Sequence, residues 1–256
     1  MSQPADAMLV ARDLHRQFGG VRAVNGASFT VPSGRITGLI GPNGAGKTTA
    51  LNIIAGALRP DAGTVYYQGR SITALPSYKV ARHGIIRTFQ VSSEFAALTV
   101  LENLLVAAPE QRGETLRQAV LGKRYWRPQE RADVERARLL LARFEMSAKE
   151  DEYAGNLSGG QKRLLELMRG LMANPALLLL DEPMAGVSPS LARRIEQHLL
   201  DLCSEGLSML MIEHELAVVE RLCDPVIVMA QGRVISQGTM ADVRADQEVL
   251  NAYLIG

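Results

Sequence analysis

The chain has 256 residues, of which 47% are apolar and 21% charged, and its formal net charge is +1. This balance is typical of a globular protein with a substantial core, and it argues against a disordered or low-complexity chain. A near-neutral total provides no electrostatic footprint for nucleic acid, so no nucleic-acid partner is expected.

The N-terminus and the apolar runs indicate neither a signal peptide nor a membrane span. Residues 1–7, MSQPADA, have no basic or apolar region and are expected to be a flexible lead. The longest apolar runs, such as residues 176–180, are far shorter than the roughly 20 residues that cross a bilayer. Cys203 and Cys223 lack metal-site or redox spacing and are expected to be small buried hydrophobes. We therefore expect a cytoplasmic protein.

Strand-like runs occur early and late in the chain. They lie at residues 8–12, 27–31, 35–40, 63–69, 85–89, 177–182, 207–213 and 225–230. The runs near 180 and 210 are almost continuously apolar, as in strands buried on both faces of a parallel sheet. The early runs alternate more and are joined by turn-like segments, which favours an antiparallel piece beside the parallel core. The pattern predicts an α/β fold.

Between residues 100 and 154 the pattern becomes helical. Residues 99–108 and 130–146 have helical periodicity, and the second stretch is apolar on one face. We expect a helical subdomain over residues 91–160, inserted into a core made of residues 8–90 and 161–256. Trp126, the only tryptophan, lies in this insert, where a packing role is expected.

The stretch GPNGAGKTT matches the phosphate-binding pattern G-x-x-x-x-G-K-[ST] in full, between an expected strand and an expected helix. Its glycines let the backbone approach phosphates, Lys47 would reach the β- and γ-phosphates, and the Thr48 hydroxyl would ligate Mg²⁺. The residues expected to bind the phosphates are Gly41, Pro42, Asn43, Gly44, Ala45, Gly46, Lys47, Thr48 and Thr49.

Acidic and imidazole side chains follow two neighbouring buried runs. Asp181 and Glu182 end the run LLLLDE, at the strand end where ligands bind in open α/β sheets. Asp181 can hold the Mg²⁺ shell, and Glu182 can accept a proton from an attacking water. Alone, such a pair is as often a helix cap as a catalytic pair. His214 closes the next run in the same way, which favours a γ-phosphate contact over a structural role.

Two further candidates are less specific. Gln90 follows the run IIRTF, where its amide could sense Mg²⁺ or water, although an ordinary turn residue is the alternative. Phe18, in RQFGG, offers a flat face for adenine, with core packing as the alternative.

A second anion site is expected far from the first. In LSGGQK, Ser158, Gly159, Gly160 and Gln161 precede a helical run, and the backbone N–H groups of a helix N-terminus attract anions. The chain therefore has two candidate sites for one class of ligand.

In this order the motifs resemble the nucleotide-binding subunit of an ABC transporter. The match comprises an aromatic A-loop (Phe18), Walker A, a Q-loop (Gln90), the signature (residues 157–161), Walker B (residues 177–181) with Glu182, and the switch histidine His214. The resemblance implies an α/β fold with a RecA-like P-loop core, an antiparallel β subdomain and an inserted helical subdomain. It also implies that two subunits, identical or different, sandwich two ATP molecules with Mg²⁺, so that the second anion site serves the partner's ATP.

Shorter stretches resemble one group within that family, the subunits that drive import of branched-chain amino acids. These stretches are IIRTFQ, LTVLENLLVA, MIEHEL and EVLNAYLIG. The resemblance implies permease subunits as partners, an extracytoplasmic solute-binding protein as an indirect partner, and a place on the inner face of the membrane. Ser188 departs from the family pattern, because an aspartate usually stands there in the D-loop, and this puts the usual D-loop contact in doubt.

Other functions remain open at this level. The ATPases of urea import and lipopolysaccharide extraction are similar in the DEP-x-AG stretch. A nucleic-acid-associated ABC ATPase would carry a long coiled coil or two cassettes, which this chain lacks. A cassette without turnover would be expected to lose some of the catalytic set, yet Lys47, Gln90, Asp181, Glu182 and His214 are all present.

Overall fold

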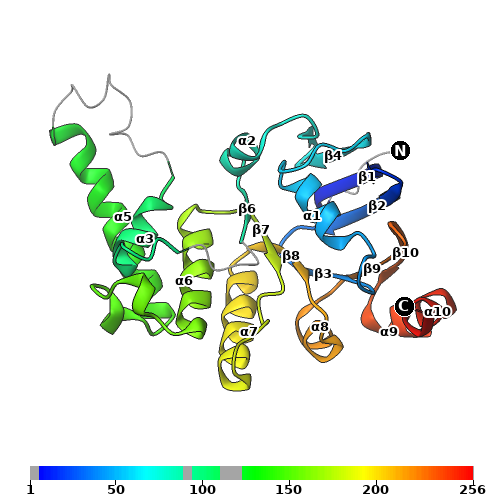
Figure 1. Cartoon of the computed structure of the whole chain (residues 1–256). Helices are drawn as coiled ribbons and strands as arrows, with labels where there is room; N and C mark the ends of the chain where they lie inside the picture. Colours follow the sequence, from blue (N-terminus) through cyan, green and yellow to red (C-terminus); the bar gives the residue numbers. More distant parts are fainter. Residues whose placement is uncertain (1–5, 89–93, 110–122, 256) are drawn as a thin grey trace. The chain divides into compact units, whose positions relative to one another are not determined.

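A computed structural model describes residues 6–88, 94–109 and 123–255, and the chain divides into two compact units (Figure 1). We call them the core unit, which comprises Met1–Arg87, Ala176–Ala185 and Glu196–Gly256, and the helical unit, which comprises Thr88–Pro175 and Gly186–Ile195. The subdomain bounds expected from the sequence, residues 91–160, stay a prediction. Of the expected N-terminal lead, residues 1–5 lie outside the described part, and β1 already begins at Ala7.

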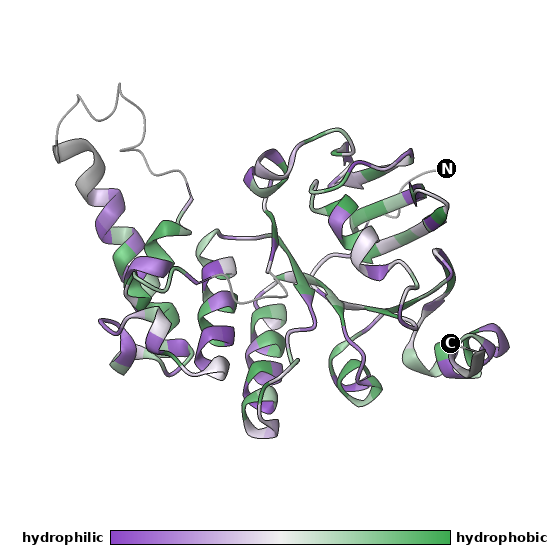
Figure 2. Cartoon of the chain, viewed as in Figure 1, coloured by the Kyte–Doolittle hydropathy of each residue, from purple (hydrophilic) through white to green (hydrophobic). Residues whose placement is uncertain are grey.

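The core unit contains a mainly parallel sheet with strand order β10-β9-β3-β8-β7-β6. Its strands are β3 (Ile36–Ile40), β6 (Ile85–Arg87), β7 (Leu177–Asp181), β8 (Ser208–Ile212), β9 (Val226–Ala230) and β10 (Arg233–Gly238). Neighbours from β9 to β6 pair in parallel, and β10 pairs antiparallel with β9. Every residue of β3, β7 and β8 is buried, and Figure 2 colours these strands mostly as hydrophobic. This confirms the parallel core predicted from their apolar runs.

The same unit contains an antiparallel sheet with strand order β2-β1-β4-β5. Its strands are β1 (Ala7–Phe18), β2 (Val21–Pro32), β4 (Ala62–Tyr67) and β5 (Arg70–Ser71). In β2 the buried Ala27 and Phe29 flank the exposed Ser28, which is the alternation of a sheet with one face in the core. The buried side chains of this sheet form one hydrophobic cluster with residues of α1 (Lys47–Ile54) such as Leu51. The predicted antiparallel piece is therefore confirmed.

The remaining helices of the core unit follow the strands in the chain. They are α2 (Ser77–Arg82), α8 (Leu216–Leu222), α9 (Met240–Ala245) and α10 (Gln247–Ile255), and α7 (Pro189–Ser204) has residues in both units. In the described ranges, no helix is long and apolar enough to span a bilayer.

The helical unit contains no strand longer than an isolated bridge in its described residues, as expected from the sequence pattern. Its helices are α3 (Val100–Val106), α5 (Lys123–Arg143) and α6 (Gly159–Met172), with short 3₁₀ turns at Ser147–Lys149 and Ala154–Asn156. Both α3 and α6 begin with a capping box, in which a hydroxyl side chain and a side chain three residues later each bond the other's backbone N–H. The side chain of Trp126 lies outside the described residues.

The two cysteines behave differently. Cys223 is buried, and burial raises the pKa of its thiol to about 12. Cys203 is only partly buried, and its Sγ lies 3.3 Å from the carbonyl oxygen of Gly34. Among the described residues, no cluster of histidine, cysteine and acidic side chains could hold a metal ion. Cys223 is therefore as buried as expected, whereas Cys203 is not.

Adjacent leucines on α7 allow a matched test of this packing. Leu199 is fully buried and Leu200 is 40% exposed. We expect Leu199→Ala to lower the free energy of unfolding by about 2–5 kcal/mol, because it leaves a cavity in the core. We expect Leu200→Ala to change it by less than about 0.5–1 kcal/mol, because little apolar surface is lost from the interior. Urea unfolding followed by circular dichroism measures both, and similar losses would contradict this difference in burial.

Candidate functional site

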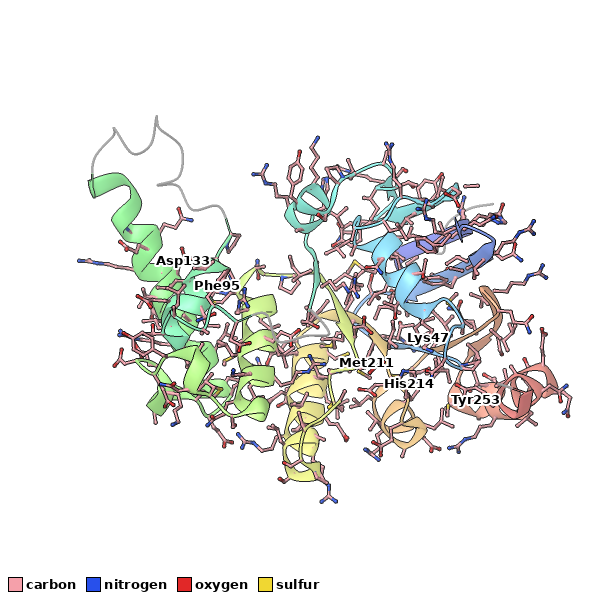
Figure 3. All side chains as sticks on the ribbon, viewed as in Figure 1. Lys47, Phe95, Asp133, Met211, His214 and Tyr253 are labelled. Carbon is pink, nitrogen blue, oxygen red and sulfur yellow. The ribbon has the colours of Figure 1, made fainter. Side chains whose placement is uncertain are left out.

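The phosphate loop connects β3 to α1, and its lysine is held by the loop itself. Lys47 begins α1, is only 6% exposed, and its Nζ donates to the carbonyl oxygens of Gly41 at 2.7 Å and Pro42 at 2.9 Å. Burial lowers the pKa of Lys47, whereas the carboxylates of Glu182 and Asp181 act in the opposite direction. The ammonium is thus directed toward the loop backbone, and both carboxylates act to raise its pKa. Figure 3 labels Lys47 and His214 on the core unit.

Two glycines of the loop are required by close backbone packing. Gly41 has φ 145°, and a Cβ there would lie 2.0 Å from the carbonyl oxygen of Met229. Gly46 has φ 97°, and a Cβ there would lie 2.2 Å from the carbonyl oxygen of Ala23. No side chain fits at either position, so this backbone path is available only to glycine.

The other loop residues differ in their exposure. Ala45 is buried and its N–H donates to the carbonyl oxygen of Pro42 at 3.2 Å, which closes the turn. The exposed residues are Asn43, Gly44 and Thr48, and the half-buried ones are Pro42, Gly46 and Thr49. The loop therefore presents an accessible rim around a buried lysine.

The parallel strands β7 and β8 bring Glu182 and His214 into contact, as expected from their positions at two strand ends. Asp181 lies opposite Ile212 in the ladder, and the next residue, Glu182, donates its N–H to the Ile212 carbonyl oxygen at 3.0 Å. Nε2 of His214 lies 2.8 Å from Oε1 of Glu182. Glu182 has φ 50°, in the left-handed region, a conformation that costs a non-glycine residue on the order of 1–3 kcal/mol.

Asp181 is fully buried and forms an ion pair with Arg87, a residue that sequence reasoning missed. Nη2 of Arg87 donates to Oδ2 of Asp181 at 2.8 Å, and its Nη1 donates to Oδ1 of Asn52 on α1. The sequence did not indicate that Arg87 has an acidic partner, because the ion pair forms only when β6 lies beside β7. Arg87 supplies the positive charge that a buried carboxylate requires.

A magnesium ion fits the donors that are present. Thr48 offers a hydroxyl and Asp181 a carboxylate, which are the hard oxygen ligands that Mg²⁺ prefers. Asp181 is linked to α1 through Arg87, which donates both to Asp181 and to Asn52 of that helix, and Thr48 lies in the first turn of α1. The third expected ligand, Gln90, lies outside the described residues.

Glu213 is a second residue that sequence reasoning missed. It precedes His214, is 5% exposed, and accepts N–H groups from Met184 and from His214, each at 3.2 Å. The only signal in the sequence was an acid at the end of an apolar run, and that position was interpreted through its histidine neighbour.

The aromatic candidate Phe18 ends β1 and is 47% exposed. The guanidinium carbon of Arg16 lies 4.9 Å from its ring centroid, and Arg16 also pairs with Asp61 at 2.7 Å. Phe18 is therefore a surface aromatic held by a cation rather than a core residue, and its stacking on adenine stays a prediction.

In the helical unit, the LSGGQK stretch forms the N-terminus of α6. Ser158 is the N-cap; its Oγ accepts the Gln161 N–H at 3.3 Å, and its own N–H donates to Oε1 of Gln161 at 2.9 Å. Ser158 and Gly159 are exposed, and a Cβ at Gly159 would meet open space, whereas Gly160 packs near Leu191. The N–H groups of the first helical turn have no acceptor within the helix, which suits an anion.

Comparison with known proteins identifies the family. The model of the ABC transporter family matches residues 24–185, which is more than half of the chain. The probable branched-chain amino acid transport ATP-binding protein LivG of Archaeoglobus fulgidus is 40% identical over 247 residues, covering 96% of this chain and 95% of its own. The high-affinity protein of the same name from Escherichia coli is 35% identical over 255 residues, covering 99% of each chain.

Solved structures lead to the same family. A nucleotide-free ATP-binding cassette from an ABC transporter has a TM-score of 0.83 and 38% identity, covering 96% of this chain and 98% of its own. An ADP-bound conformation of such a cassette has the same TM-score and identity, covering 97% and 98%. The RecA-like P-loop fold with its antiparallel and helical additions is thereby confirmed, and this chain belongs to the ABC transporter family as one of its ATP-binding, ATP-hydrolysing subunits.

Proposed function

We propose that this chain is the motor subunit of an importer for branched-chain or other hydrophobic amino acids. The observation that carries its role as an ATP-hydrolysing motor is the contact of Glu182 with His214 at 2.8 Å, at the sheet edge where the carboxylates of Glu182 and Asp181 also act to raise the pKa of Lys47. This arrangement joins a proton acceptor, its orienting partner and a phosphate-binding cation. The names of the relatives from Archaeoglobus fulgidus and Escherichia coli support the choice of substrate.

Each side chain then has a role in hydrolysis. Lys47 exchanges its loop carbonyl partners for β- and γ-phosphate oxygens, and the glycine backbone lets the phosphates approach. Bound Mg²⁺, held by Thr48, Asp181 and Gln90, would neutralise phosphate charge. Glu182 accepts the proton of the water that attacks the γ-phosphorus as the bond to the leaving oxygen breaks. His214 holds the Glu182 carboxylate in place and contacts the γ-phosphate.

The signature residues complete the site in a second subunit. We propose that Ser158 to Gln161 bind the ATP held by the phosphate loop of a partner subunit, identical or homologous, and that Phe18 stacks on the adenine. In this proposal the chain binds permease subunits on the inner face of the membrane, and an extracytoplasmic solute-binding protein is an indirect partner. Ser188 stands where the family has an aspartate. Its Oγ lies 3.4 Å from the Leu191 N–H at the start of α7, a capping contact that an aspartate would also make.

Removal of the loop lysine should weaken ATP binding. Lys47→Ala should raise the dissociation constant about 10- to 100-fold, because charge-assisted hydrogen bonds to phosphate contribute roughly 1.5–3 kcal/mol. Lys79→Ala, which removes an exposed lysine of α2, is the matched control and should leave affinity unchanged. Isothermal titration calorimetry measures both, and equal affinities for the two variants would contradict the assignment of the loop.

A hydrolysis-deficient variant should form the ATP sandwich. Glu182→Gln should lower turnover about 10²- to 10⁴-fold by removing the proton acceptor, and it should be a dimer in ATP but a monomer in ADP. Adding Ser158→Arg places a bulky side chain at the exposed N-cap, so the double variant should stay monomeric while binding ATP normally. Light scattering decides between these outcomes, and a double variant that dimerises in ATP would show that LSGGQK is only a helix cap.

The transported substrate is tested in cells whose only copy of this chain is the Glu182→Gln variant. Uptake of labelled leucine, isoleucine or valine should fall about 10²-fold, in line with the loss of hydrolysis. Urea uptake in the same cells is the control and should be unchanged. If leucine uptake stayed normal and urea uptake fell, the chain would instead belong to a urea import system.

A further inference from the structure

Glu213 is a buried acid whose two oxygens hold the two loops that carry the catalytic pair. Oε1 accepts the N–H of Met184 at 3.2 Å, and Oε2 accepts the N–H of His214 at 3.2 Å. Met184 belongs to the turn after β7, and His214 follows β8. One carboxylate therefore connects the main chains on both sides of the contact between Glu182 and His214.

The turn after β7 requires such support. Glu182 has φ 50°, and a non-glycine residue keeps this conformation only where its surroundings impose it. The Ala185 N–H donates to the Glu182 carbonyl oxygen at 3.1 Å, and the Glu182 N–H donates to Ile212, which fixes the two ends of Glu182 itself. Glu213 adds the bond to Met184, and this bond fixes the residues that follow Glu182.

Packing alone does not explain an acid at position 213. The preceding residues of β8 are all buried and apolar except Ser208, so an apolar side chain would fill the same volume without the cost of burying a carboxylate. Burial raises the pKa of Glu213, and so does the nearby Glu182 carboxylate, while the N–H groups of Met184 and His214 lower it. An apolar residue at position 213 could not supply the two oxygens that accept these N–H groups.

We propose that Glu213 is a positioning residue, which holds Glu182 and His214 in the geometry for proton transfer by accepting the backbone N–H groups of Met184 and His214. This inference rests on the proposed function, because it assumes that Glu182 takes the proton from water. Glu213 does not itself touch the reacting atoms in this role. Its effect is on turnover and not on the binding of ATP, since the phosphate loop is formed by other residues.

Two substitutions separate positioning from packing. Glu213→Met keeps the length of the side chain and removes both acceptors. Glu213→Gln keeps the shape of the side chain but replaces one acceptor oxygen by an NH₂ group. One backbone N–H then faces a donor instead of an acceptor. The same two substitutions at the exposed Glu215, two residues along the same loop, are the matched control. The full chain is used throughout, at a temperature where circular dichroism shows every variant to be folded.

We expect both Glu213 variants to lower kcat about 10²-fold, because a displacement of about 1 Å in a catalytic group has an effect of this size. Their dissociation constants for ATP should stay within about twofold of the wild type, and the Glu215 variants should match the wild type in both quantities. Glu213 variants with wild-type kcat would overturn the proposal. Parallel losses of kcat and of ATP affinity would also overturn it, because they indicate general destabilisation.

A crystal structure of Glu213→Met tests the geometry without reference to turnover. The contact between Glu182 and His214 should be lost, and retention at its present 2.8 Å would overturn the proposal.

Glu182→Gln tests the proposed function in the same turnover assay as the Glu213 variants. If the wild type hydrolyses ATP and Glu182→Gln turns over equally fast, the proposed proton acceptor is wrong, and that outcome is distinct from a failure of Glu213 to position it.

Discussion

The parallel pairing of β7 with β8 is the constraint on which the rest of the site depends. The ladder places Asp181 opposite Ile212, so the residues that follow these two positions must leave the sheet side by side. Glu182 follows β7 in a left-handed backbone conformation, and its side chain contacts His214. The buried carboxylate of Glu213 accepts backbone N–H groups on both sides of this contact. A shift of the ladder by one residue would reverse the faces of these side chains and separate the pair.

Charge balance is the second constraint, because the site has ionisable groups in a poorly solvated place. Lys47 is buried against the carbonyl oxygens of its own loop, and Asp181 is buried against Arg87. Neither charge could stay ionised at low cost without its partner. Both partners come from elements that border the phosphate loop or the strand edge, so the same packing that forms the core also prepares an anion site. Asp181 and Glu182 then act to raise the pKa of Lys47, whose side chain is already held by the loop.

Much of this arrangement could be predicted from the sequence, because the informative features are local. The apolar runs near 180 and 210 predicted buried parallel strands, and the glycine loop was predicted between a strand and a helix, which are β3 and α1. The packing of Gly41 and Gly46 against the main chain of Met229 and Ala23 was not predicted. Arg87 and Glu213 could not be recognised, because Asp181 and Met184, with which they bond, lie on or after another strand, and the sequence does not show which strands are neighbours. The strands β5 and β10 were missed for a related reason: β5 has two residues, and β10 is a largely polar strand at a sheet edge. Cys203 is less buried than its type suggests.

The claim that Glu182 and His214 act as one unit can be measured directly with a double-mutant cycle. Turnover of ATP is compared in the wild type, Glu182→Gln, His214→Ala and the double variant, with the folded fraction of each determined in parallel. Residues that function only together are strongly non-additive. We predict that the double variant is no slower than the slower single variant. Losses that multiply would show that the two side chains act independently, and would contradict the role assigned to their contact.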